Sequence, residues 1–121
     1  MLANVEIKPA SGFEAVTGEV VARQILDLWQ GVPLPLVSSF SEVALEAARS
    51  VAPQLPLGYL WERPAADWKA RFDALGAYSL HCSARELDDS VIQVATEAGI
   101  PVLCWTVNDR RAAEALLRRG V

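Results

Sequence analysis

Short apolar segments alternate along the chain with longer segments in which apolar residues recur at helical spacing. Five segments are rich in apolar and β-branched residues, as expected for strands; they cover residues 4–9, 34–40, 55–61, 77–81 and 101–107. After each of them, apolar residues recur every three or four positions, which predicts an amphipathic helix. A strand followed by a helix, repeated along the whole chain, is typical of a parallel sheet covered by helices.

N-cap residues and the spacing of apolar residues predict where these helices begin and which face each one buries. The first helix is predicted to begin at Thr17 or Gly18, with an apolar face made by Val21, Ile25, Leu28 and Trp29. The second follows a good N-cap residue, Ser41, and its apolar stripe is Val43, Ala44, Ala47, Ala48 and Val51. Aspartates are placed to cap the other three helices: Asp67, then Asp88 or Asp89, and Asp109.

The predicted strands and helices fit a barrel better than a nucleotide-binding fold. No glycine-rich phosphate loop follows any predicted strand, as a dinucleotide-binding sheet would require. The remaining α/β architecture is a partial TIM (β/α)8 barrel of about five βα units with parallel strands, over residues 1–121. A complete barrel has eight strands and about 250 residues. We therefore expect an incomplete barrel domain, cut at both ends, whose first strand is parallel and interior.

Composition narrows the class of protein. Hydrophobic residues make up 52% of the chain and charged residues 21%, as in a folded globular domain. The net charge of −4, with no basic stripe, argues against nucleic-acid binding. No apolar run approaches the length of a membrane span, and no secretory signal precedes the first strand, so we expect a cytoplasmic protein. Cys82 and Cys104 lack metal or redox spacing, which favours buried thiols in a reducing compartment over a disulfide.

Polar residues lie where the predicted strands end. In a parallel βα sheet, functional side chains gather at the carboxyl ends of the strands. That edge is predicted to hold Glu6, Lys8, Ser38, Ser39, Trp61, Glu62, Arg63, His81, Trp105, Thr106 and Asn108. Glu6 and Lys8 are two residues apart, so they share one face of their strand. This pair indicates the rim of an active site; the alternative is the solvent-exposed face of an ordinary antiparallel strand.

Each main candidate has two interpretations. Glu6 is either an ion-pair partner of Lys8 or a ligand of a hard cation such as Mg²⁺ or Ca²⁺, although one carboxylate does not make such a site alone. Lys8 is either that ion-pair partner or a point charge for phosphate. His81, the only histidine, is either an acid or base or a packing residue. Trp105 is either the flat wall of a substrate pocket or part of the core. Two serines without a visible base are predicted hydrogen-bond partners: Ser38 and Ser39.

Four motifs resemble those of glycerophosphodiester phosphodiesterases, in the same order and at similar separations. They are Asn4–Pro9, Ser38–Ser41, Ser79–His81 and Trp105–Asn108. The resemblance is closest to the bacterial cytoplasmic form. It implies a TIM-type barrel that uses a divalent metal to hydrolyse glycerophosphodiesters to an alcohol and glycerol 3-phosphate. It also implies that Glu6 binds the metal, that Lys8 approaches the substrate phosphate and that Trp105 lines the glycerol pocket.

The chain also departs from the pattern of that family. The family's His-Arg-Gly strand, its Glu-x-Asp strand, its second histidine followed by Asp and its final Asp-rich strand are not found here. The chain therefore resembles the C-terminal portion of the family, and we expect no meaningful activity from it alone. We also expect self-association through open sheet edges. Two alternatives stay open: another phosphate-ligand TIM-barrel enzyme, or a non-catalytic remnant that pairs with another polypeptide.

Overall fold

The predicted strands form one five-stranded parallel sheet. The computed structural model describes residues 3–121; Met1 and Leu2, the first residues of the predicted domain 1–121, lie outside the described residues. The strands are β1 (Asn4–Glu6), β2 (Leu36–Ser39), β3 (Leu57–Trp61), β4 (Ser79–Ser83) and β5 (Val102–Trp105). The helices are α1 (Glu14–Leu28), α2 (Glu42–Val51), α3 (Trp68–Leu75), α4 (Asp89–Glu97) and α5 (Arg110–Arg119).

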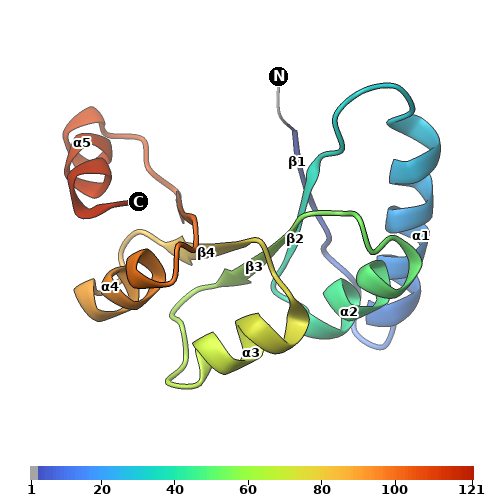
Figure 1. The fold of residues 1–121 in the computed structure, drawn as a ribbon, viewed down its shortest axis with the longest axis horizontal. Coiled ribbons are helices and arrows are strands. Elements are labelled where there is room, and N and C mark those ends of the chain that lie inside the picture. The colour runs from blue at the N-terminus through green and yellow to red at the C-terminus, as the bar shows by residue number, and fades with distance from the viewer. Residues whose placement is uncertain (1–2) are drawn as a thin grey trace.

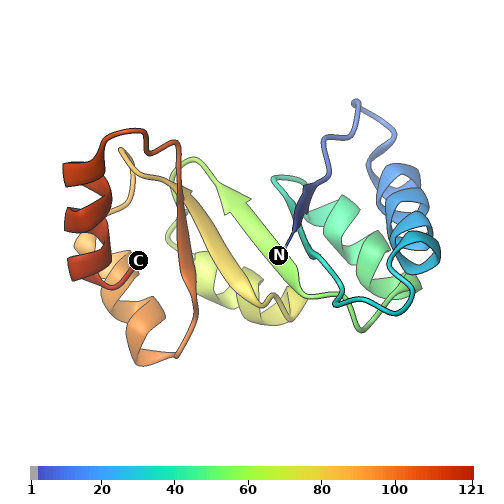
Figure 2. The same cartoon turned by 90° about the horizontal axis from the view of Figure 1, so that it is seen from above.

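The strands follow one another across the sheet in chain order, and every neighbouring pair is parallel. The helices lie on the outer side of the sheet, from α1 at one edge through α3 to α5 at the other (Figure 1). Seen from above, the two ends of the sheet and their helices lie far apart, so the described residues form an open arc (Figure 2). This confirms the predicted fold class, a partial TIM (β/α)8 barrel.

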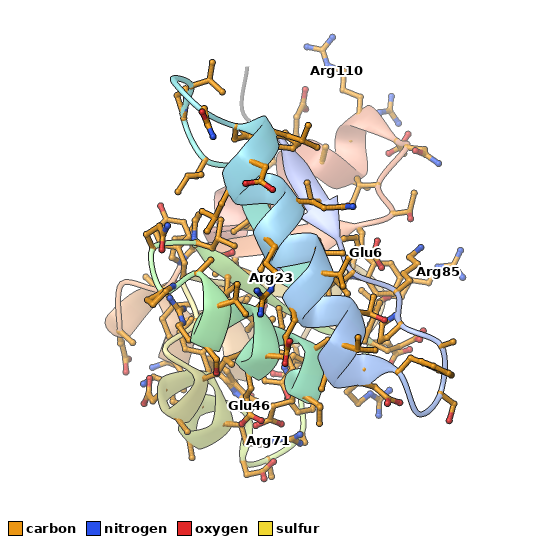
Figure 3. The ribbon with its side chains drawn as sticks, turned by 90° about the vertical axis from the view of Figure 1, so that its right-hand side faces the viewer. Glu6, Arg23, Glu46, Arg71, Arg85 and Arg110 are labelled. Carbon is orange, nitrogen blue, oxygen red and sulfur yellow. The ribbon has the colours of Figure 1, made fainter. Side chains whose placement is uncertain are left out.

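The core lies between the sheet and its helices. Alternate strand residues point to opposite faces of a sheet, and the buried apolar residues of the helix-facing set are Val37, Leu57, Tyr59, Leu80, Cys82 and Val102. They pack in one cluster with apolar helix residues, among them Ala22, Leu45, Ala48, Phe72 and Ile92. Charged side chains such as Arg23 of α1 and Glu46 of α2 lie on outward helix faces (Figure 3). The other alternate set, which includes Ser38, His81 and Leu103, faces the concave side, and none of the described helices covers that side.

Helix α1 begins earlier than predicted. It starts at Glu14 and not at Thr17 or Gly18. The backbone N–H and the hydroxyl of Thr17 both donate to the Phe13 carbonyl, at 2.9 and 2.6 Å. The bond from the Thr17 N–H is an ordinary i to i+4 helix bond, so the first turn already begins after Phe13.

The buried face of α1 also differs from its prediction. The buried residues are Gly18, Ala22 and Ile25, whereas Leu28 is 74% exposed. A Cβ built on Gly18 would lie 2.2 Å from the Ala44 carbonyl oxygen of α2. Gly18 therefore lies on this face because the two helices approach each other almost backbone to backbone there.

Smaller differences affect α2 and all five strands: β2, β3 and β5 are shorter than the predicted segments 34–40, 55–61 and 101–107. In α2, the buried residues Ala44, Leu45 and Ala48 share one face at helical spacing. Leu45 was not predicted to be on that face, and Val43, which was, is 51% exposed. Strand β4 runs over Ser79–Ser83, later than the predicted 77–81. Strand β1 ends at Glu6, before the predicted end, although the N–H of the next residue still donates to the β2 carbonyl at 2.7 Å.

Strand β1 lies at an edge of the sheet. Within residues 3–121 it pairs with β2 alone, and β5 pairs with β4 alone. The expectation of a parallel first strand is confirmed, and the expectation of an interior one is wrong for the described chain. Both edges therefore present unpaired backbone groups.

Three of the predicted caps are confirmed and one is not. The side chains of Ser41, Asp88 and Asp109 accept hydrogen bonds from the backbone N–H three residues on, at 3.2, 3.0 and 2.8 Å. Asp67 occupies the N-cap position of α3, but its side chain makes no capping hydrogen bond within the described chain. Its ψ of 11° lies outside the extended region in which an N-cap side chain reaches the helix N–H groups.

Candidate functional site

A hollow of about 400 Å³ opens on the concave side of the sheet. Its wall includes Glu6 of β1, Lys8 just after it, His81 of β4 and Trp105 of β5. Parallel pairing brings these residues together, because it sets the carboxyl ends of all the strands at one edge. The structure thus places the main predicted site residues around one hollow.

Glu6 and Lys8 form a loose ion pair at the rim. The Lys8 Nζ lies 3.6 Å from the Glu6 Oε1, and the two side chains are 77% and 33% exposed. An exposed pair of this kind contributes at most about 1 kcal/mol. The pair is therefore weak.

Two serines hold the rim strand in place. The Ser38 hydroxyl donates to the Asn4 Oδ1 at 3.0 Å. The Ser39 hydroxyl donates to the Ile7 carbonyl at 2.8 Å and accepts from the Ser41 N–H at 3.0 Å. Their predicted role as hydrogen-bond partners is confirmed. They fix the orientation of β1, and with it the direction in which the acidic and basic rim residues point.

His81 lines the hollow and is only 3% exposed. Its Nε2 is 2.9 Å from the Ser79 hydroxyl, two residues earlier on the same face of β4. Burial lowers the pKa of His81 below its usual value. The imidazole is therefore neutral at pH 7.

Trp105 and Phe40 form an aromatic side of the hollow. Their rings meet edge to face, with centroids 5.7 Å apart and planes at 82°. The Trp105 Nε1 is buried and has no hydrogen-bond partner within residues 3–121. Phe40 was not singled out from the sequence, although its place directly after Ser38 and Ser39, at the end of β2, was a usable signal. Trp105 is thus a wall of the hollow and not only a core residue.

Some candidates lie away from this hollow. The Arg63 guanidinium pairs with the Glu86 carboxylate of the next loop. Asn108 lines a different shallow hollow beside α5, with Arg85 and Arg119. A position at the end of a strand therefore predicts the edge of the sheet at which a residue lies, but not whether its side chain turns inward.

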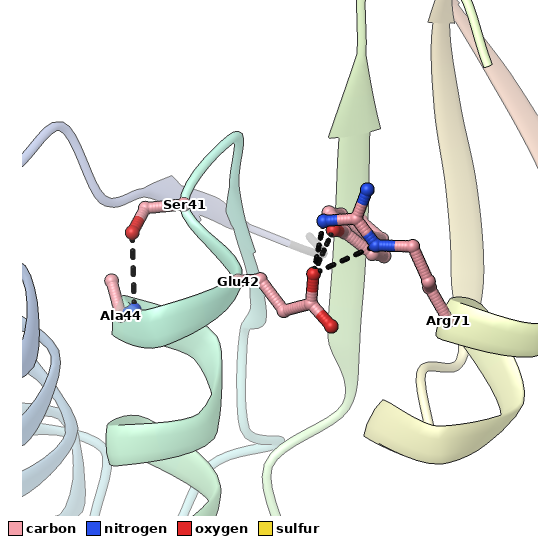
Figure 4. A network of polar contacts seen from close by, with 5 residues as sticks. Ser41, Glu42, Ala44 and Arg71 are labelled. Atoms are coloured by element: carbon pink, nitrogen blue, oxygen red, sulfur yellow. Dashed lines mark hydrogen bonds and ion pairs between the residues drawn. The ribbon is translucent and has the colours of Figure 1, made fainter. Parts of the chain in front are cut away.

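A charged network behind the sheet was not predicted. The Glu42 Oε2 accepts hydrogen bonds from the Tyr59 hydroxyl at 2.7 Å and from the Arg71 Nε at 2.9 Å (Figure 4). The bond from Tyr59 and then that from Arg71 lower the pKa of Glu42. The Arg71 guanidinium also lies over the Trp61 ring, 4.8 Å from its centroid. The network ties α2, β3 and α3 together outside the hollow.

Both cysteines are free thiols, as predicted. Cys82 and Cys104 are register partners on β4 and β5. Burial, followed by the neighbouring Cys104, raises the pKa of Cys82 to about 12. The Cys82 thiol is therefore protonated and unreactive at neutral pH.

The described residues do not complete a divalent-metal site. Among the described residues that line the hollow, Glu6 is the one carboxylate. No three His, Cys, Asp or Glu side chains within residues 3–121 come close enough together to hold a metal ion. A hard cation takes several oxygen ligands, so Glu6 supplies one ligand and not a site.

None of the described helices has the length and apolar character needed to cross a membrane.

The fold and the hollow define a (β/α)-barrel domain with a polar, aromatic-walled site at the carboxyl ends of its strands. The sequence profile of the glycerophosphoryl diester phosphodiesterase family matches residues 1–121, and the chain belongs to that family. The resemblance seen in the four motifs is thereby confirmed. A comparison with curated protein sequences gives no match.

Solved structures show the same fold. A phosphodiesterase from Oleispira antarctica, in complex with the product sn-glycerol-3-phosphate, is 30% identical with a TM-score of 0.92, over 100% of this chain and 49% of that one. A protein from Silicibacter pomeroyi assigned as a glycerophosphoryl diester phosphodiesterase is 20% identical with a TM-score of 0.84, over 99% of this chain and 45% of that one. The chain thus spans about half the length of the solved structures that it matches.

Proposed function

We propose that the protein takes part in the hydrolysis of glycerophosphodiesters to an alcohol and glycerol 3-phosphate. The observation that carries this proposal is the convergence of Glu6, Lys8 and Trp105 on one hollow in a chain of this family. The Oleispira antarctica relative, described in complex with sn-glycerol-3-phosphate, supports the same ligand class.

Each of the three residues has a proposed role. Lys8 places a mobile ammonium charge at the rim, which suits a phosphate oxygen. Trp105 offers a flat apolar surface to the glycerol carbons. Glu6 is proposed as one ligand of the divalent ion, Mg²⁺ or Ca²⁺, that the family resemblance implies; such an ion would stabilise charge on the phosphate.

We also propose that residues 1–121 alone turn over glycerophosphodiesters poorly. General acid–base hydrolysis needs a paired acid and base, and the sequence holds one histidine, whose imidazole lies buried and neutral. Metal-dependent release of glycerol 3-phosphate from glycerophosphocholine by the purified chain would contradict this proposal.

Calorimetry with sn-glycerol 3-phosphate tests the proposed site. Lys8 and Lys69 are the only lysines in the sequence, and Lys69 pairs with Asp73 on α3, outside the hollow. Lys8→Met is expected to weaken binding about tenfold, since it removes a charge-assisted hydrogen bond, whereas Lys69→Met should leave the affinity unchanged. Equal affinity in the Lys8→Met and Lys69→Met variants would refute the proposed phosphate role.

Two further parts of the proposal concern partners and location. The open edges of β1 and β5 favour association of the chain with itself. The free thiols of Cys82 and Cys104 favour a reducing, cytoplasmic compartment.

A further inference from the structure

His81 is a buried polar group on the inner face of the sheet to which the proposed function gives no role. It is the only histidine in the sequence, it is 3% exposed, and it forms part of the wall of the hollow. A buried imidazole costs free energy unless its nitrogen atoms are hydrogen-bonded. Its partners therefore indicate what it does.

The surroundings of His81 are built to admit and orient the ring. On the neighbouring strand β3, a Cβ at Gly58 would lie 2.6 Å from the His81 Nε2 and 2.7 Å from its Cε1. Only glycine leaves room for the imidazole there. The Ser79 hydroxyl, 2.9 Å from Nε2, then fixes the far edge of the ring.

The other ring nitrogen is left for a ligand. Within residues 3–121, the imidazole makes one side-chain hydrogen bond, through Nε2 to Ser79. A neutral imidazole has one donor and one acceptor nitrogen, and a serine hydroxyl can bond either. The Nδ1 therefore presents a neutral donor or acceptor, which suits a hydroxyl group better than a phosphate charge.

The position of His81 in the sheet points to the glycerol end of a ligand. His81 pairs in register with Leu103 of β5, the strand that also carries Trp105, whereas Lys8 follows β1 at the opposite edge. A ligand whose phosphate meets Lys8 and whose carbons lie on Trp105 would bring its hydroxyl groups toward β4.

We propose that His81 hydrogen-bonds a hydroxyl group of the glycerol moiety and so selects polyol phosphates over plain alkyl phosphates. This inference rests on the proposed function, because it assumes the ligand orientation given above. In it, Gly58 and Ser79 are positioning residues that act through His81. A site built to bond a hydroxyl rejects the analogue that lacks it, since its own polar atom is then left unpaired.

The single histidine allows a direct test by NMR. The chain is labelled with ¹³C and ¹⁵N in histidine only and titrated with sn-glycerol 3-phosphate, propyl phosphate and inorganic phosphate. We expect the imidazole nitrogen signals to shift in saturable fashion with glycerol 3-phosphate and to stay nearly unchanged with the other two. If calorimetry shows glycerol 3-phosphate bound while the imidazole signals do not move, the inference is wrong and the proposed function stands.

Variants give a second readout that a merely structural histidine would not affect. In the unaltered chain, glycerol 3-phosphate is expected to bind about tenfold more tightly than propyl phosphate, equivalent to about 1.4 kcal/mol. Lys8→Met should weaken both ligands and keep that ratio, whereas His81→Leu should reduce the ratio to near one. A ratio preserved in His81→Leu would overturn the inference. If glycerol 3-phosphate does not bind the unaltered chain at all, the proposed function fails, and this inference fails with it.

Discussion

At the scale of single residues, the absence of a side chain at Gly58 leaves the space that the His81 imidazole occupies. A methyl group at Gly58 would sit 2.6 Å from the His81 Nε2, a separation that real Cβ atoms essentially never show. Gly58→Ala is therefore expected to lower the free energy of unfolding by about 1–3 kcal/mol, as overpacking of a core does. Urea denaturation followed by circular dichroism measures this.

A double-mutant cycle shows whether the ring causes that loss. With His81→Ala in the background, Gly58→Ala should cost much less, because the atoms that clash are gone. Additive losses in the double variant would mean that the clash with the imidazole is not the cause.

The buried imidazole also makes stability depend on pH. Burial lowers the pKa of His81 in the folded chain, so below the unfolded value of about 6.5 the unfolded chain binds more protons. The free energy of unfolding is therefore expected to fall as pH drops from 7 toward 5.5. Glu42 contributes mainly below this window, because its folded pKa lies under 4.5.

The sole histidine gives this prediction a clean control. His81→Leu should flatten the decline between pH 7 and 5.5, measured by urea denaturation at each pH. An equal decline in His81→Leu would assign the effect to other groups.

At the scale of whole elements, Arg49 joins α2 to the loop that follows it and to the end of α3, near the amino ends of the strands. From α2, its guanidinium donates to the carbonyls of Pro53 and Leu55, at 2.8 and 3.2 Å, and to that of Gly76 after α3, at 2.6 Å. Arg49→Ala is expected to lower the free energy of unfolding by about 2 kcal/mol, since hydrogen bonds from a charged group are lost. Arg49→Lys should recover little, because an ammonium lacks the planar fork.

An arginine on α1 serves as the matched control. Within residues 3–121, Arg23 makes only an exposed pair with Glu19, at 3.7 Å. Arg23→Ala should change the free energy of unfolding by less than about 0.5 kcal/mol. Comparable losses in the Arg23→Ala and Arg49→Ala variants would remove the special role given to Arg49.

The elements themselves were largely predictable, because local chemistry sets them. The order of strands and helices follows from the spacing of apolar residues, and three caps follow from side chains that bond the next turn. The features that were predicted wrongly or missed depend on contacts between residues far apart in the sequence. The buried face of α1 is set by Gly18 against α2, and the Glu42 network joins three elements that no local pattern connects.

The site was predictable only in part for the same reason. The strand-end rule placed Glu6, Lys8 and Trp105 at one edge, and all three line the hollow. It did not single out Phe40, whose contact with Trp105 bridges β2 and β5. Nor did it show that His81 turns inward, which depends on the glycine of the adjacent strand.

For the molecule as a whole, the open arc predicts association. The edges of β1 and β5 present unpaired backbone groups within the described chain, and Leu103 on β5 is 40% exposed. Exposed edges and apolar surface favour pairing between chains. Sedimentation velocity is expected to show the mass rising with concentration. A single monomer peak at every concentration would count against this.

The most direct measurement of the central claim is a crystal structure of the chain with sn-glycerol 3-phosphate. The ligand is expected in the concave hollow, with a phosphate oxygen within about 3 Å of the Lys8 Nζ and the glycerol carbons against the Trp105 ring. Ligand density confined to another surface, or an empty hollow in crystals grown at saturating ligand, would contradict it.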